Sequence, residues 1–199
     1  MKSGLIGIIL LAAGASVRLG EAKQLLEFDN QTLLRRSAET ALKVSDCVVI
    51  TLGARSEILR REIEDLPVKI VENEYWDAGM GGSVRIGLAT LIEKAENLKG
   101  VIIMVCDQPF VSRDCLEKLI AKFKETNAPI VACEYSNTLG VPVLFSANIF
   151  PELLALEFSH GAKTLIKKHR QQVVSVACPD GAFDIDTPED YERLLKLTV

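Results

Sequence analysis

A nearly continuous run of branched apolar residues from Leu5 to Leu11 constrains the fold more than any other feature of this chain. A strand with one solvent-exposed face alternates apolar and polar residues, whereas a continuous apolar run is typical of a strand covered on both faces in a parallel sheet. Similar runs follow, each with a segment of helical periodicity behind it. The expected strand and helix pairs are Cys47 to Leu52 with Ala54 to Asp65, Val68 to Val71 with Ser83 to Ala95, and Val101 to Val105 with Ser112 to Lys124. This alternation predicts an α/β fold with a mostly parallel central sheet and helices on both faces.

The pattern loosens beyond Asn127, where three more strands and two helices are expected. They are Ile130 to Tyr135, Val141 to Phe145 and Val173 to Ala177 as strands, and Ala147 to Leu156 and Ala162 to His169 as helices. A last helix should begin at Thr187, with Thr187 as N-cap and Pro188 in the first turn. No repeat or linker interrupts residues 1–199, which predicts a single domain with a nucleotide-binding N-terminal half and an acceptor-binding C-terminal half.

The bulk composition narrows the class of protein. A net charge of −4 without blocks of like charge argues against nucleic-acid and membrane partners. The cysteines show no CxxC spacing and sit mostly in apolar runs, so we expect buried thiols in a reducing cytoplasm, neither zinc ligands nor disulfides. They are Cys47, Cys106, Cys115, Cys133 and Cys178.

The N-terminus superficially imitates a secretory signal, because Lys2 precedes the apolar stretch from Leu5 to Ala13. That stretch leads directly into the most structured motif of the chain, so we expect it to belong to the fold. No segment approaches the roughly 20 apolar residues of a membrane helix.

The motif that follows the first strand reads Leu-Ala-Ala-Gly-Ala-Ser-Val-Arg-Leu-Gly-Glu-Ala-Lys, from Leu11 to Lys23. Its small residues let backbone N–H groups approach anionic oxygens, and Arg18 and Lys23 supply positive charge. The spacing fits neither of two well-known phosphate loops, since five residues separate Gly14 from Gly20 and no G-x-G-x-x-G is present. We therefore expect a triphosphate site of another kind, against the alternative of an ordinary strand-to-helix turn with surface cations.

Two acidic segments offer partners for that loop. Asp107 ends the strand that begins at Val101, at the sheet edge where the loop also lies, and Mg²⁺ needs only one or two carboxylates besides phosphate oxygens and water. In Asp-Ile-Asp-Thr the alternation of an extended segment points Asp184 and Asp186 to one side. We expect Asp107 and Asp186 as metal ligands, although a strand-end turn and a helix start would also explain them.

A glycine-rich segment from Gly79 to Arg85 is expected to be a loop that closes over a base or ribose, with Ser83 as the N-cap of the next helix. The alternative is a glycine-rich connection without a ligand.

These motifs, taken in order, resemble those of nucleotidyltransferases. The loop resembles the L-A-A-G-x-S-x-R-x-G-x-x-K signature, in a form close to that of molybdenum cofactor cytidylyltransferases, and it is followed by D-Q-P and D-I-D-T-P-E-D. The resemblance implies a Rossmann-like three-layer α/β/α nucleotidyltransferase fold, in which CMP passes from CTP to the phosphate of molybdopterin, with Mg²⁺. Ala13, in Leu-Ala-Ala-Gly, resembles the residue found at this position in the CTP-using branch of the family. Guanylyl-transferring relatives usually show Leu-Ala-Gly-Gly there.

The resemblance also implies roles for individual residues. Arg18 and Lys23 would be catalytic. The residues that would contact the acceptor are Gln108, Pro109, Gly140 and Pro142. An ordinary turn into a strand explains Gly140 and Pro142 equally well. The implied nucleotide-binding residues are Leu11, Ala12, Ala13, Gly14, Ser16, Arg18, Lys23, Gly79, Met80, Gly82, Ser83 and Asp107.

Alternatives remain open at this stage. The chain could be a methylerythritol-phosphate or other sugar-phosphate nucleotidyltransferase. It could also be a non-catalytic nucleotide-binding chaperone for a molybdoenzyme. If the chain is a cytidylyltransferase, a molybdoenzyme could be the partner that receives its product. Ser159 and His160 depart from the Gly-Asp-x-Gly-Ala pattern of related enzymes, which makes the acceptor the least defined partner.

Overall fold

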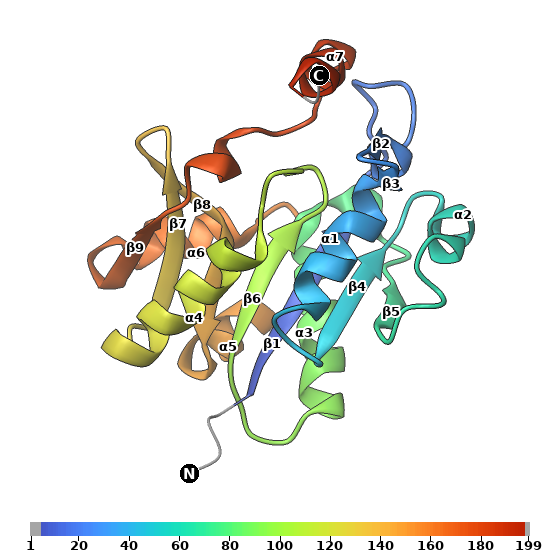
Figure 1. Ribbon diagram of the computed structural model, residues 1–199. Helices are drawn as coiled ribbons and strands as arrows, with labels where there is room; N and C mark the ends of the chain where they lie inside the picture. Colours follow the sequence, from blue (N-terminus) through green and yellow to red (C-terminus); the bar gives the residue numbers. More distant parts are fainter. Residues whose placement is uncertain (1–4, 198–199) are drawn as a thin grey trace.

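The computed structural model describes residues 5–197 and contains one seven-stranded sheet, in the order β5-β4-β1-β6-β8-β7-β9 (Figure 1). Lys2 lies outside the described residues. Only β8 runs against the others, because it pairs antiparallel with both β6 and β7. The strands are β1 Leu5–Ala12, β4 Val48–Leu52, β5 Lys69–Glu72, β6 Leu98–Val105, β7 Ile130–Tyr135, β8 Thr138–Ser146 and β9 Val173–Ala177. The expected mostly parallel sheet is confirmed.

Helices cover both faces of this sheet, which gives three layers (Figure 1). Residues of α1, α2 and α4 pack on one face, and residues of α3, α5 and α6 pack on the other. The helices are α1 Leu33–Leu42, α2 Ser56–Arg61, α3 Met80–Lys94, α4 Arg113–Thr126, α5 Phe150–Leu154, α6 Ala162–Lys168 and α7 Pro188–Lys196. Within residues 5–197, no helix combines the length and apolar character needed to cross a membrane.

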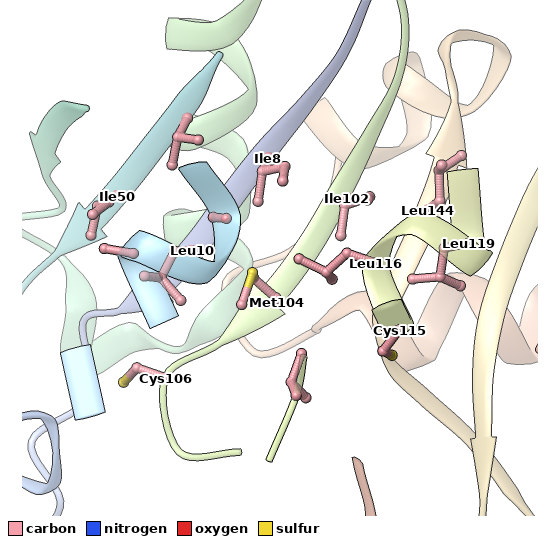
Figure 2. Packing of buried hydrophobic residues seen from close by; sticks show 14 of the residues in the cluster. Ile8, Leu10, Ile50, Ile102, Met104, Cys106, Cys115, Leu116, Leu119 and Leu144 are labelled. Carbon is pink, nitrogen blue, oxygen red and sulfur yellow. The ribbon is translucent and has the colours of Figure 1, made fainter. Parts of the chain in front are cut away.

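The central strand β1 explains why the sequence shows an uninterrupted apolar run. Ile8 and Leu10 enter the core beneath α1 and α4, whereas Ile9 and Leu11 enter the core beneath α3. Figure 2 shows the first of these cores, where Ile8 and Leu10 lie beside the side chains of β6 and α4. Because successive side chains point to opposite faces, a strand covered on both sides needs apolar residues at every position.

The main differences from expectation lie in helix boundaries. The helix expected over Ala147 to Leu156 is a 3-10 turn, Ala147–Ile149, followed by α5, and Pro151 in the first turn of α5 cannot donate the bond that would continue a preceding helix. The helix expected over Ala54 to Asp65 is confined to α2, since Arg55 adopts a left-handed conformation before it. Helix α1, capped by the Thr32 hydroxyl, was not expected.

A small apolar cluster joins the segment after β1 to the C-terminal segment above the sheet. It contains Leu26 and Phe28 beside Ile185 and Leu194, and it brings the hairpin of β2 Glu27–Phe28 and β3 Gln31–Thr32 against α7 (Figure 1). Helix α7 begins as expected, with Thr187 as N-cap in a reciprocal capping box and Pro188 in the first turn. This packing fixes the segment that carries Asp186 beside the loop after β1.

Candidate functional site

The loop after β1 is held in shape by a buried glutamine. The side-chain amide of Gln24 donates hydrogen bonds to the carbonyl oxygens of Ala12 at 3.0 Å and Gly14 at 2.7 Å. Ser16, which has a φ of 57°, donates to the Gln24 carbonyl oxygen at 3.3 Å and accepts from the backbone N–H of Lys23 at 3.1 Å. These contacts fix the conformation of the loop. Sequence reasoning missed Gln24, since its position beside Lys23 did not reveal that it is buried.

Two cations of the loop meet two carboxylates from distant segments. The Lys23 ammonium donates hydrogen bonds to Asp107 at the end of β6 and to Asp186 before α7, the second at 3.1 Å. Arg18 lies 2.8 Å from the other carboxylate oxygen of Asp186. The backbone N–H of Ile185 donates to the carbonyl of Asp107 at 3.0 Å, which joins the two acidic segments directly. The expected convergence of these four side chains is therefore present.

Lys23, Arg18, Asp107 and Asp186 form a charged junction, in which the charges stabilise one another. Burial of Lys23 opposes its charge, but the nearby Asp107 and Asp186 carboxylates outweigh that effect and raise the pKa of Lys23 above its ordinary 10.5. Partial burial also opposes the charge of Asp186, yet the hydrogen bonds and charges of Lys23 and Arg18 lower its pKa below 3.8. Asp184 differs, because burial and the charge of Asp107 raise its pKa.

This arrangement has the donor set that a hard divalent cation requires. Asp107 and Asp186 both contact one cationic atom, the Lys23 Nζ, so their carboxylates already point to a common position. Mg²⁺ takes one or two carboxylates and completes its shell with phosphate oxygens and water. Asp107 and Asp186 therefore fit a metal, and Asp184 lies in an adjoining cavity.

Two adjoining cavities open at this edge of the sheet. The first has a volume of about 210 Å³ and is lined by the loop after β1, by Trp76 and by the start of α3. The second, of about 350 Å³, is lined by residues of β6, β7, β8 and α6, together with Asp184 and Asp186. Met80, Val105 and Asp107 line both cavities. Two ligands could thus occupy neighbouring positions with Asp107 between them.

Most of the nucleotide-binding candidates line the first cavity. These are Leu11, Ala12, Ala13, Gly14, Lys23, Gly79, Met80, Ser83 and Asp107. Ser16, Arg18 and Gly82 are not among its lining residues, and the Arg18 side chain is 70% exposed beside Asp186.

The acceptor candidates are less well supported by the geometry. Gln108 lines the second cavity, where its amide donates to the carbonyl of Gly181 at 2.8 Å. Val141 lines this cavity, whereas its buried neighbours Gly140 and Pro142 do not. The carbonyl of Pro109 accepts a hydrogen bond from Arg36, and Pro109 lines neither cavity.

The glycine-rich segment is not the loop that was expected. Helix α3 already begins at Met80 with Gly79 as N-cap, so Gly81 and Gly82 are helical and the prediction of Ser83 as N-cap is wrong. A Cβ on Gly81 would lie 2.0 Å from the carbonyl oxygen of Glu157, which shows that close packing requires this glycine. The buried Ser83 hydroxyl instead accepts a hydrogen bond from Asn73 at 3.0 Å.

Comparison with known proteins gives consistent matches over nearly the whole chain. The family model of the MobA-like NTP transferase domain matches residues 8–173. The chain is 31% identical to the purine catabolism protein PucB of Bacillus subtilis, with 98% of each chain covered. It is 27% identical to a probable molybdenum cofactor guanylyltransferase of Methanosarcina mazei, covering 94% of this chain and 88% of that protein. It is 22% identical to the molybdenum cofactor cytidylyltransferase of Escherichia coli, covering 94% of this chain and 93% of that protein.

Solved structures agree with these matches. Rv0371c of Mycobacterium tuberculosis superposes with a TM-score of 0.83 at 31% identity, covering 98% of this chain and 100% of that chain. A second structure of Rv0371c, in complex with manganese, gives a TM-score of 0.78 at 29% identity, covering 98% of this chain and 99% of that chain.

Proposed function

The chain belongs to the MobA-like NTP transferase family, and from that premise we propose that it transfers CMP from CTP to the phosphate of a molybdopterin-type acceptor, with release of pyrophosphate. The nucleotidyltransferase assignment follows from the family. The identity of the nucleotide, the acceptor and the metal is the proposal.

One observation carries the proposal. Lys23 and Arg18 lie against Asp107 and Asp186 where two cavities meet, so a nucleotide in the first cavity and an acceptor in the second would have their phosphates at the same charged junction. Transfer of a nucleotidyl group needs that juxtaposition, because the attacking and leaving oxygens must lie on opposite sides of one phosphorus.

The reaction places simple demands on the protein. An oxygen of the acceptor phosphate forms a bond to the α-phosphorus, and the bond from that phosphorus to the bridging oxygen of pyrophosphate breaks. The acceptor phosphate is already anionic, so no strong general base is required. In this proposal Lys23 and Arg18 stabilise the charge that develops on the triphosphate oxygens, and the loop held by Gln24 orients them.

The same carboxylates would hold the metal. Asp107 and Asp186 would hold Mg²⁺, which neutralises charge on phosphate oxygens when bound. The manganese complex of Rv0371c, a relative at 29% identity, supports a divalent cation in this family. Lys23 would then contact phosphate oxygens in place of one of its present carboxylate partners.

Support for CTP comes from Ala13, which lines the first cavity. Its methyl group takes up space that glycine would leave open at this position, and a pyrimidine is smaller than a purine. Support for a molybdopterin-type acceptor comes from the names of two relatives, a cytidylyltransferase and a guanylyltransferase of the molybdenum cofactor. Delivery of the product to a cytoplasmic molybdoenzyme would be the corresponding partner interaction.

The decisive experiment measures pyrophosphate release with purified protein and Mg²⁺. CTP, GTP, ATP and UTP are each tested with molybdopterin, with methylerythritol phosphate and without acceptor. Release only with CTP and molybdopterin is expected. Pyrophosphate release with GTP would overturn the assignment of CTP as the nucleotide, and release with methylerythritol phosphate would overturn the assignment of molybdopterin as the acceptor. Nucleotide binding without pyrophosphate release under any of these conditions would favour a non-catalytic nucleotide-binding protein.

A further inference from the structure

Three of the five cysteines, which are far apart in the sequence, meet in the fold. Cys115 lies in the first turn of α4, Cys133 in β7 and Cys178 directly after β9, and their sulfur atoms all lie within 4.8 Å of one another. The sulfurs of Cys115 and Cys133 are 3.4 Å apart. The cysteines are buried as expected, but their spacing in the sequence did not reveal that these three elements pack together. We call these residues the tricysteine cluster.

From this geometry we propose that the tricysteine cluster is a binding site for a soft monovalent cation of the Cu⁺ class, separate from the nucleotide site. A metal about 2.3 Å from each of three sulfurs requires sulfur atoms about 4 Å apart, and the cluster spans that range. Thiolate ligands favour such soft ions over Mg²⁺ or Mn²⁺.

The number of ligands favours Cu⁺ over Zn²⁺. Protein zinc sites are almost always four-coordinate, but no histidine or carboxylate among residues 5–197 joins the cluster. A water molecule is a poor fourth ligand here, because Cys133 is fully buried and Cys115 and Cys178 are only 7% and 4% exposed. A closed set of three sulfurs therefore suits a three-coordinate ion.

Cys178 is the thiol of the cluster that ionises most readily. Hydrogen bonds from Cys115 and Cys133 lower its pKa, whereas hydrogen bonds within the cluster and burial raise the pKa of Cys133 and of Cys115. Metal binding would release the remaining thiol protons to solvent, so that all three sulfurs coordinate as thiolates. The Lys118 ammonium offsets part of the negative charge that results.

A bound ion would stabilise a part of the fold that leads to the nucleotide site. Cys178 begins the segment that continues through Gly181 to Asp184 and Asp186, and its backbone N–H already donates to the carbonyl of Glu134 in β7 at 3.1 Å. Joining α4, β7 and this segment through one ion would resist their separation, in addition to the apolar packing around Cys115 (Figure 2).

The test is an anaerobic titration of the reduced full-length chain with Cu⁺, against a chromophoric Cu⁺ chelator. We expect one ion per chain, with an ultraviolet thiolate-to-copper charge-transfer band. Cys133→Ala and Cys178→Ala should each weaken binding at least about tenfold, whereas Cys47→Ala, a buried cysteine outside the cluster, should bind as the unmodified chain does. Equal binding by all of these variants, or no binding by the unmodified chain, overturns the proposal.

X-ray absorption on the copper-loaded, unmodified chain keeps the test independent of whether the variants fold. Three sulfur neighbours support the site, and a shell of nitrogen or oxygen neighbours overturns it. Binding of Zn²⁺ without Cu⁺ would overturn the three-coordinate assignment. Neither measurement depends on nucleotidyl transfer, so the outcome is separate from that of the proposed function.

Discussion

The ammonium group of Lys23 lies 3.1 Å from a carboxylate oxygen of Asp186, a residue 163 positions further along the chain. The same ammonium donates to Asp107 at the end of β6. One side chain thus joins the loop after β1 to both acidic segments, and the charged junction exists only when the two halves of the chain have folded together.

Replacement of Lys23 by alanine should reduce turnover by about 10² to 10³, the usual effect of removing one preorganised group that stabilises transition-state charge. Steady-state pyrophosphate release measures this. The matched control is Lys122→Ala, which removes an ion pair with Glu125 in the C-terminal part of α4 and should leave turnover unchanged. Unchanged turnover in the Lys23 variant would remove Lys23 from the catalytic role.

Gln24→Ala should weaken both the fold and nucleotide binding. It leaves the carbonyl oxygens of Ala12 and Gly14 without their shared donor, and an unsatisfied buried acceptor costs about 1–3 kcal/mol. Denaturant unfolding should show this loss, and the KM for the triphosphate should rise because the loop is no longer held in shape. Gln31→Ala, which removes a partly exposed bond to Glu39, should change neither quantity appreciably.

Gly81→Ala should destabilise the start of α3. Its Cβ would lie 2.0 Å from a backbone oxygen of Glu157, which cannot move as easily as a side-chain tip, and overpacking of this kind costs about 1–3 kcal/mol. Thermal unfolding is the measurement. Gly14→Ala is the control, since a Cβ there meets nothing within 4 Å and should leave the melting temperature unchanged.

A pH-dependent contribution to stability is expected between α5 and α6. Glu152 accepts hydrogen bonds from Lys168 at 2.7 Å and His169 at 3.0 Å, and these interactions, that of Lys168 first, lower its pKa below 4.5. A lowered folded-state pKa means that the contribution is fully present above pH 4.5 and is lost as the pH falls through the folded-state value.

Glu152→Gln should therefore cost about 0.5 kcal/mol of unfolding free energy at neutral pH, because solvent screens this partly exposed pair, and the difference should shrink toward zero in acid. Urea unfolding at several pH values measures it. A difference that grows as the pH falls would contradict the assignment. Glu117→Gln, in an exposed pair with Arg113, serves as the control.

The sequence was sufficient for the sheet and for part of the charged junction, because local patterns show where each strand lies and where it ends. The apolar run of β1 identified a strand covered on both faces, and parallel strands bring their carboxyl ends to one edge, which is why Asp107 could be placed near Lys23. The capping chemistry of Thr187 and Pro188 similarly located the start of α7.

Features that depend on three-dimensional packing could not be predicted in this way. The glycines at the start of α3 appeared to be a flexible loop, since nothing in the sequence shows that residues 157–160 press against them. The meeting of Cys115, Cys133 and Cys178 depends on the register of β7 and β9, which no cysteine spacing encodes. The α1 helix, in contrast, had a readable signal in its Thr32 cap, which was overlooked.

The choice between Asp184 and Asp186 as second metal ligand leads to the last prediction. Asp186 shares the Lys23 ammonium with Asp107, whereas burial and the charge of Asp107 raise the pKa of Asp184, which makes Asp184 less ready to ionise. We therefore expect Asp186→Asn to raise the Mg²⁺ concentration for half-maximal turnover by at least about tenfold, and Asp184→Asn to leave it within a few-fold of the unmodified chain.

Chelation of the metal should abolish turnover in all three proteins, and added Mg²⁺ should restore it. If Asp184→Asn alone shifted the metal requirement, the second ligand would be Asp184, and the contact between Lys23 and Asp186 would serve only to hold the segment before α7 in place.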